Sequence, residues 1–251
     1  MRHAIQIFTI ALALCALLAP AGAFAIETRV AVAANFSATL RVLAVAFEKS
    51  HGQRVLISTG STGRLYAQIL HGAPYDLFLA ADTERPRLLS ESGHSEAPFT
   101  YALGQLVLVG HASDPAPPGQ RLARGEFRRL AIANPKTAPY GLAATHLLER
   151  LGLDPASEGR IVRGESVLQA HQFVITGNAD LGVVAHSLVA LDDGTPYVTV
   201  DPGLYDPIRQ DAVLLARGRD NPTALAFAAY LRSHEARAII ERYGYRTVAD
   251  E

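Results

Sequence analysis

Between residues 28 and 81 the sequence alternates short apolar runs with segments of helical periodicity, and this alternation limits the possible folds more than any other feature. The apolar runs lie at 28–33, 55–57 and 76–81. The segments between them, 38–50 and 64–69, repeat their apolar residues three or four positions apart. Strands that alternate with helices in this way are typical of a parallel sheet whose faces are covered by helices. We therefore predict an α/β fold.

The alternation continues toward the C-terminus but is interrupted near residues 101–110 and again near 200–212. Two lobes joined by two hinge crossings explain both interruptions, so we predict that each lobe is a mostly parallel sheet flanked by helices. A single continuous doubly wound sheet is the alternative. Further strands are expected at 101–109, 130–133, 160–162, 180–184, 197–200 and 211–215, and further helices at 142–151, 167–175 and 222–243. The predicted divisions are a signal peptide at 1–25, lobe 1 at 26–103, lobe 2 at 104–207, and the return to lobe 1 with the C-terminal helices at 208–251.

The first 25 residues are typical of a secretory signal peptide. Arg2 and His3 precede an apolar run, and Ala23 and Ala25 flank Phe24 as in a small-x-small cleavage site. We expect cleavage near Ala25 and a periplasmic protein, because the apolar run is short for a membrane span and no later run approaches that length. The single cysteine lies inside this segment. The mature chain is therefore expected to have no disulfide, which suits an oxidising compartment.

Charge and histidine spacing make several classes of function improbable. Without Arg2 the chain has 22 basic and 24 acidic residues, so its net charge is 22 − 24 = −2. No basic field is present to attract nucleic acid, and no polybasic run suggests a membrane surface. The histidines are scattered without the spacing of metal ligands, so no direct metal site is predicted.

Four turns share one pattern, in which a buried strand is followed by a short turn containing Asn, Ser, Thr or Gly and then by a helix start. They lie at 35–37, 61–63, 139–141 and 166–167, with the second inside the longer polar stretch 58–63. Helix N-termini offer unpaired N–H groups and a positive dipole, and ligands of open α/β sheets bind beyond the carboxyl ends of the strands. Because each lobe contributes two turns and none contains lysine, facing lobes would hold a small anion by hydrogen bonds alone. The alternative is that these turns are ordinary connectors.

An enzyme is the main alternative from another class of function. Thr59 stands where the G-x-S-x-G nucleophile pattern around Ser61 needs glycine, and no lysine follows Gly63 as a phosphate-binding P-loop requires. Asp82 and Asp180 lie at strand ends, where a capping role is expected rather than a catalytic one. We therefore predict a protein that is not an enzyme, and a periplasmic hydrolase is kept as the weaker alternative.

An ordered set of motifs resembles the periplasmic molybdate-binding proteins of bacterial molybdate ABC transporters, which are type II periplasmic binding proteins. The likeness covers nearly all of residues 27–246. The motifs are VAANF at 32–36, STGSTGRLYAQI at 58–69, GAPYDLFLAAD at 72–82, LAIANP at 130–135, PYG at 139–141, DLGVV at 180–184 and RYGY at 242–245.

The resemblance implies a site for a tetrahedral oxyanion between the lobes, held by hydroxyls and backbone amides. It places Asn35 in the first turn and Thr62, next to Ser61, in the second. It places Tyr140 and Val167 in the other lobe, with Val167 acting through its backbone N–H. The resemblance also implies hinge motion on binding, near residues 101–106 and 203–212.

Two positions depart from the family pattern. Some members have a tyrosine where Ala185 stands, and Tyr140 is then expected to supply the missing hydroxyl. Thr62 replaces the commoner serine, which keeps the hydroxyl and adds a methyl group.

By resemblance the ligand is molybdate or tungstate, with molybdenum or tungsten present only as the bound oxyanion. Sulfate is smaller than either, so fixed donors should favour the two metal oxyanions. We expect a monomer without a cofactor that delivers its ligand to the membrane permease of an ABC transporter. A binding protein for sulfate, phosphate or a small organic anion is the closest alternative.

Overall fold

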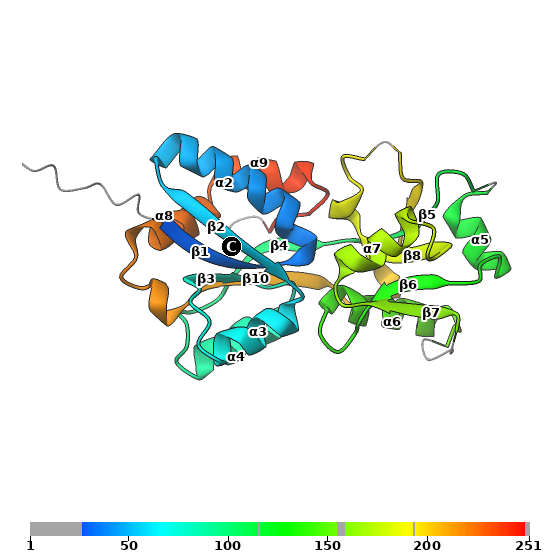
Figure 1. Cartoon of the computed structure of the whole chain (residues 1–251), viewed down its shortest axis with the longest axis horizontal. Coiled ribbons are helices and arrows are strands. Elements are labelled where there is room, and N and C mark those ends of the chain that lie inside the picture. The colour runs from blue at the N-terminus through cyan, green and yellow to red at the C-terminus, as the bar shows by residue number, and fades with distance from the viewer. Residues whose placement is uncertain (1–26, 115, 155–158, 193, 249–251) are drawn as a thin grey trace, which may run out of the picture.

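The structure is a computed structural model that describes residues 27–114, 116–154, 159–192 and 194–248. It contains two five-stranded sheets that lie in two lobes side by side (Figure 1). The predicted signal peptide, its cleavage site and Cys15 lie outside the described residues. None of the described helices is both long and apolar enough to cross a membrane.

The first sheet has the strand order β2-β1-β3-β10-β4. Strand β1 runs parallel to its neighbours β2 and β3, whereas β10 runs antiparallel to β3 and β4. The strands are β1 (Glu27–Ala33), β2 (Arg54–Gly60), β3 (Leu77–Leu79), β4 (Phe99–Gly104) and β10 (Ile208–Leu214).

The second sheet has the strand order β7-β6-β8-β5-β9. Strand β6 runs parallel to β7 and β8, and β5 runs antiparallel to β8 and β9. The strands are β5 (Leu106–Gly110), β6 (Leu130–Ala133), β7 (Ile161–Gly164), β8 (Leu181–Ala185) and β9 (Tyr197–Thr199). The predicted two-lobed α/β class is confirmed, and the single continuous sheet is excluded.

The chain passes from the first sheet to the second at Gln105, between β4 and β5, and returns between β9 and β10. The run 101–109, expected as one strand, is therefore two strands in different sheets. The lobe boundaries at 103/104 and 207/208 stay a prediction; β4 of the first sheet extends to Gly104, and β10 begins at Ile208.

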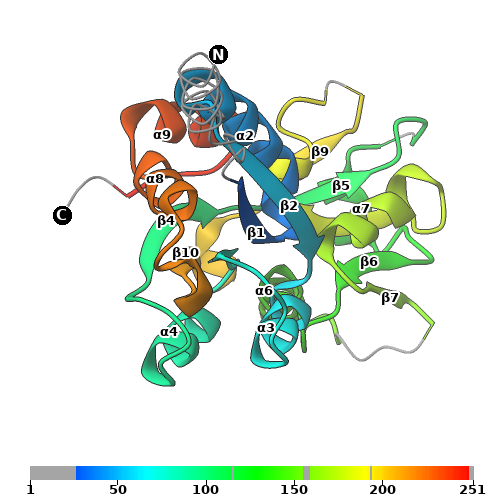
Figure 2. The same cartoon turned by 60° about the vertical axis from the view of Figure 1, so that its left-hand side comes forward.

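Helices cover both faces of the first sheet, which explains why its strands are apolar on both sides. Val30 and Val32 pack with Phe36 and Phe227 on one face, whereas Ala31 packs on the other face. The first face is covered by α2 (Ser37–His51), α8 (Pro222–Tyr230) and α9 (His234–Arg242), and the second by α3 (Thr62–Leu70) and α4 (Glu84–Glu91) (Figure 2).

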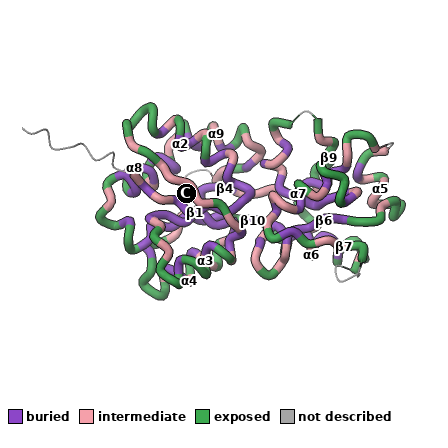
Figure 3. The backbone as a smooth tube through the Cα atoms, viewed as in Figure 1, coloured by how far each residue is buried: buried purple, intermediate pink, exposed green. Residues whose placement is uncertain are grey.

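The second lobe has its own core, to which α6 (Pro139–Arg150) and α7 (Val167–Ile175) contribute Leu147, Leu148 and Val174. Helix α5 (Pro118–Arg124) lies at the far end of this lobe. Four short 3-10 helices complete the described residues: η1 (Ala34–Phe36), η2 (His186–Leu188), η3 (Pro202–Leu204) and η4 (Ala216–Gly218). The buried segments are mainly the inner strands β1, β3, β5, β6, β8 and β10 and the inner faces of the helices, whereas the edge strands β2, β7 and β9 are more exposed (Figure 3).

Two predicted turns prove to be parts of regular elements. Ser58, Thr59 and Gly60 continue β2, because β1 pairs with β2 as far as Gly60. The turn is thereby reduced to Ser61. Residues 139–141 form the first turn of α6, where a proline at the first helical position is favourable because it has no N–H to leave unpaired.

Ser37, the last residue of the predicted turn at 35–37, is the first residue of α2 and not its cap, because η1 precedes α2 and the Ser37 hydroxyl donates to the Ala34 carbonyl at 3.0 Å. One predicted helix is wrong in its extent. The helix expected at 222–243 is two helices. Its apolar stripe continues across the break, but the Ser233 hydroxyl accepts the Ala236 amide at 3.2 Å and starts α9 there.

Candidate functional site

A small, partly open pocket lies where the two lobes meet, and all five predicted site residues line it. Its cavity volume is about 10 Å³, which leaves room for a compact solute and little else. The lining residues of the first lobe are Ala33, Ala34, Asn35, Ser61, Thr62 and Ala81, and those of the second are Ala138, Pro139, Tyr140, Ser166 and Val167.

The two hydroxyl-bearing residues at the β2–α3 junction line the pocket and differ in their hydrogen bonds. Ser61 is the single residue between the strand and the helix, and its Oγ is buried without a hydrogen-bond partner among the described residues. The Thr62 Oγ1 accepts the Ala81 amide at 3.1 Å, which leaves its own hydrogen available to donate. A buried hydroxyl without a partner is costly, so Ser61 in particular is suited to a ligand that accepts hydrogen bonds.

Three helices, α3, α6 and α7, begin at residues that line the pocket. The first amides of a helix have no partner within the helix, and they lie at its partial positive end. Neither α3 nor α6 has a side-chain cap, whereas Ser166 caps α7 by accepting the Gln169 amide. The amides of Tyr140 and Val167 therefore occupy first-turn positions. Because the lining contains no charged side chain, the pocket offers uncharged donors in a positive field, which suits a small anion.

The side chains of Asn35 and Tyr140 bond to other residues of the protein behind the pocket. The Asn35 Nδ2 donates to Gln210 Oε1 at 2.8 Å and lies 3.0 Å from Tyr245 Oη. The Tyr140 hydroxyl accepts from Gln210 Nε2 at 3.2 Å. Both side chains therefore join a buried polar network behind the pocket. Their backbone amides are the groups that remain for a ligand.

Burial raises the pKa of the Tyr101, Tyr140 and Tyr245 hydroxyls above the ordinary value for tyrosine. All three are therefore neutral at physiological pH and can donate. Ala185, the position at which some relatives were expected to have tyrosine, is fully buried in β8 and is not among the lining residues.

The lobes touch at the mouth of the pocket. The Gly63 amide donates to the Thr137 carbonyl of the other lobe at 2.9 Å, and Arg64 forms an ion pair with Glu165 at 3.1 Å. A Cβ on Gly63 would lie 3.1 Å from the Thr137 backbone, so this approach favours glycine.

A second contact closes the rear of the pocket. The Ser187 hydroxyl donates to the Asn35 carbonyl at 3.0 Å, and the Tyr245 hydroxyl lies 2.9 Å from Ser187 Oγ. Ser187 belongs to η2, after the last core strand of the second lobe, whereas Tyr245 follows α9 of the first. Segments far apart in sequence thus meet around Asn35.

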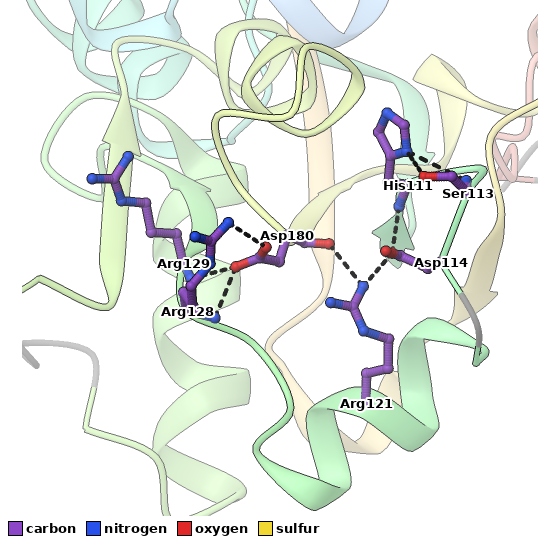
Figure 4. A network of polar contacts seen from close by, with 7 residues as sticks. All are labelled: His111, Ser113, Asp114, Arg121, Arg128, Arg129 and Asp180. Carbon is purple, nitrogen blue, oxygen red and sulfur yellow. Dashed lines mark hydrogen bonds and ion pairs between the residues drawn. The ribbon is translucent and has the colours of Figure 1, made fainter.

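The two candidate acids lie outside the pocket lining. Asp82 accepts the Arg85 amide at 3.1 Å at the start of α4, as expected of a capping group, and burial raises its pKa despite the arginine. Asp180 lies at the far end of the second lobe, where it accepts the amides of Arg128 and Arg129 at 2.8 and 2.9 Å (Figure 4).

Burial acts to raise the pKa of Asp180, but the two amides together with the charges of Arg128 and Arg121 outweigh it, and the net shift is downward. Asp180 therefore fastens a loop and does not cap a helix. In the described part of the chain, no group of three or more His, Cys, Asp or Glu side chains could hold a metal ion.

Sequence reasoning did not identify Gln210, Tyr101, Tyr245 or Ser187. The single local signal is a polar Gln210 beside the apolar run of β10, and the others have none. Their roles depend on contacts between residues more than 50 positions apart.

The chain matches the profile of a family described as bacterial extracellular solute-binding protein over residues 28–246. A molybdate-binding protein ModA of Azotobacter vinelandii is 48% identical over 230 residues, covering 88% of this chain and 90% of the relative. A molybdate-binding protein ModA of Rhodobacter capsulatus is 41% identical over 225 residues, covering 88% of each.

Solved structures give the same result. The periplasmic molybdate-binding protein of Azotobacter vinelandii superimposes with a TM-score of 0.83 at 38% identity, covering 89% of this chain and all of that one. The sulfate-binding protein SubI of Mycobacterium tuberculosis, with a TM-score of 0.72 at 15% identity, shares the fold.

Two sheets, two crossings and a pocket between the lobes define a solute-binding protein of the periplasmic type. The chain belongs to the bacterial extracellular solute-binding family, and its predicted resemblance to the periplasmic molybdate-binding proteins is confirmed.

Proposed function

We propose that this protein captures molybdate in the periplasm and delivers it to the membrane permease of an ABC transporter. The observation that carries this proposal is the pocket of uncharged donors between the lobes, in which the Ser61 hydroxyl is buried without a partner. The molybdate-binding relatives, which align over almost the whole chain, support the choice of ligand.

The ligand is bound through hydroxyls and backbone amides. Ser61 and Thr62 donate through their hydroxyls, and Asn35, Tyr140 and Val167 donate through their backbone N–H groups. A dianion that leaves water needs several such donors, and each charge-assisted hydrogen bond contributes about 1.5–3 kcal/mol. Several hydrogen-bond donors together thus compensate the charge of the ligand, because no charged side chain lines the pocket.

Tungstate is proposed as a second ligand because its size nearly equals that of molybdate. Sulfate is smaller and would not reach donors from both lobes together. The donors are held by α3 in one lobe and by α6 and α7 in the other, and contacts between the lobes limit how far they can approach, so a smaller ion would lose some of the hydrogen bonds.

The mature protein, with its signal peptide removed near Ala25, acts as a periplasmic monomer. It uses no cofactor and catalyses no reaction. N-terminal sequencing of the protein from the periplasmic fraction tests the removal of the signal peptide. The elution volume of the protein on gel filtration tests the monomeric state.

The direct test is thermal unfolding of the mature protein with molybdate, tungstate, sulfate or phosphate, followed by calorimetric titration. A ligand at 100 times its Kd stabilises the folded state by about 2.7 kcal/mol. We expect large shifts with the first two ions and little with the others. Equal shifts with all four would remove the size argument, and a shift with sulfate or phosphate alone would assign the site to that ion. Turnover of phosphate or acyl esters would instead support a hydrolase.

A further inference from the structure

Gln210 connects the two lobes through one buried side chain. It lies in β10, the strand that follows the second crossing, and its exposed fraction is 0%. Its Oε1 accepts from Asn35 Nδ2 at 2.8 Å, and its Nε2 donates to Tyr140 Oη at 3.2 Å. Asn35 and Tyr140 line the pocket from opposite lobes, so the amide of Gln210 uses both its ends to hold one residue of each.

The backbone around Gln210 is shaped for this contact. The pairing of β10 with β4 shifts register between Gln210 and Asp211, and the shift leaves Tyr101 of β4 without a paired residue. A β-bulge of this kind re-aims side chains. The Tyr101 hydroxyl reaches Gln210 Oε1 at 3.1 Å and the Ala80 carbonyl at 2.9 Å.

Gly104, at the first crossing, makes room for the contact between the lobes. A Cβ at this position would lie 2.2 Å from Tyr140 Oη and 2.8 Å from Gln210 Nε2. Any side chain would therefore displace the hydrogen bond between Gln210 and Tyr140. The backbone φ of Gly104 is not in the left-handed region, so space rather than conformation explains the glycine.

The bonds of Gln210 fall into two kinds. Those with Asn35 and Tyr101 join parts of the first lobe, so we expect them to persist when one lobe turns against the other. The bond to Tyr140 joins the two lobes, so we expect opening of the lobes to break or lengthen it. The side chain of residue 210 needs both an acceptor and a donor to make these bonds. The Gln210 Oε1 accepts from Asn35, and the Gln210 Nε2 donates to the hydroxyl oxygen of Tyr140.

We propose that Gln210 is a positioning residue that couples lobe closure to ligand retention, by holding Tyr140 and Asn35 in register when the lobes close. The proposal rests on the proposed capture of an oxyanion between the lobes. It predicts that loss of the Gln210–Tyr140 bond accelerates ligand release, because closure is weakened, and leaves ligand encounter unchanged.

The test compares ligand kinetics in the mature protein and its Gln210→Met, Tyr140→Phe and double variants. Methionine keeps the approximate volume of glutamine, and Tyr140→Phe keeps the backbone amide that is proposed to bind the ligand. Molybdate dissociation and association rates are measured by stopped flow. We expect koff to rise about tenfold in each single variant, which corresponds to the loss of one buried hydrogen bond, with kon within about twofold.

The double variant separates coupling from independent effects. If the bond carries the effect, the double variant releases ligand about as fast as either single variant. Additive increases would mean that the Tyr140 hydroxyl acts on the ligand by itself, and they would overturn the proposal. An unchanged koff in a folded Gln210→Met variant would also overturn it.

Tyr101→Phe is the matched control, because it removes a hydroxyl bonded to the same glutamine but within one lobe. We expect it to lower stability without changing koff. If Gln210→Met does not fold, a rise in koff for Tyr140→Phe with none for Tyr101→Phe supports the proposal, and equal behaviour of the two contradicts it. Small-angle scattering of ligand-bound protein adds a readout of closure that a purely structural role would not change.

The proposed function can fail separately. If the unaltered protein does not bind molybdate, that assignment is wrong, and the same kinetic comparison is made with whichever ion of the oxyanion panel it does bind.

Discussion

Replacing Ser61 with alanine should weaken ligand binding without destabilising the ligand-free protein. The Ser61 Oγ is buried and has no partner among the described residues, and it makes no capping bond to α3 even though Ser61 is the N-cap residue. The usual loss of about 0.5–2 kcal/mol for removing an N-cap serine therefore does not apply. Because its removal breaks no hydrogen bond within the protein, the free energy of unfolding of the ligand-free protein should stay unchanged.

The effect on ligand binding, in contrast, should be large. If Ser61 donates to the oxyanion, its loss removes one charge-assisted hydrogen bond of about 1.5–3 kcal/mol, which is a roughly 10- to 150-fold rise in Kd. Calorimetric titration with molybdate measures the second quantity, and urea unfolding of the ligand-free protein measures the first. Wild-type affinity in Ser61→Ala would refute the assignment of this hydroxyl to the site.

Ser50→Ala is the matched control in the same lobe. The Ser50 hydroxyl lies at the exposed end of α2 and donates to the Ala46 carbonyl at 2.9 Å. Its removal should leave the Kd unchanged. If Ser61→Ala destabilised the ligand-free protein more than Ser50→Ala does, the Ser61 hydroxyl would have a structural partner, and the reasoning from its isolation would fail.

Three other perturbations separate the parts of the site from the scaffold. Thr62→Ala should weaken binding and also lower the free energy of unfolding by about 1–3 kcal/mol without unfolding the protein, because the Ala81 amide loses its acceptor; Thr62→Ser should restore both in the same titration and urea assays. Gly63→Ala should weaken binding while leaving the melting temperature of the ligand-free protein unchanged, because the added Cβ meets Thr137 when the lobes close; a wild-type Kd would contradict this. Asp180 has a lowered pKa, so its stabilising contribution is complete above the unfolded value, near 3.9, and is lost as the pH falls through the lower folded value; urea unfolding of Asp180→Asn between pH 2 and 6 should lack this loss and binding should be unaffected.

The position of the pocket could be predicted because local sequence specifies it. Asn35, Ser61 and Val167 lie at ends of strands or starts of helices, and parallel strands bring such ends to the same edge of a sheet. The predicted helix at 167–175 agrees with α7 residue for residue. The alternation of apolar runs was sufficient for both the fold class and the crossings.

The polar network behind the pocket could not be predicted in the same way. Asn35 is 175 residues from Gln210 and 210 residues from Tyr245, and no local spacing relates them. The sequence placed Asn35 in a ligand turn without indicating what its side chain does, and tertiary contacts take up both hydrogens of its side-chain amide. The predicted role of the Tyr140 hydroxyl meets the same difficulty, because Gly104 makes space for it away from the pocket.

Boundaries failed where two local signals compete. Leu231 continues the apolar stripe of α8, so periodicity alone extends one helix to Tyr243, whereas Ser233 begins a new helix two residues later. At the other end of the chain, the polar residues 58–60 suggested a turn, but pairing with β1 keeps them in the sheet. In both cases a hydrogen bond that periodicity does not detect determined the outcome.

The contacts between the lobes suggest why closure should depend on the ligand. Closing buries the Ser61 hydroxyl and the first amides of α6 and α7, and donors buried without acceptors are costly. The direct compensation at the mouth is modest, since the Arg64 and Glu165 side chains are 60% and 61% exposed and such ion pairs contribute about 0–1 kcal/mol. An oxyanion that accepts from the buried donors removes this cost only in the closed form. Its differential affinity for the two forms then shifts the population toward closure, and the Gln210–Tyr140 bond adds to that shift because it crosses the same hinge.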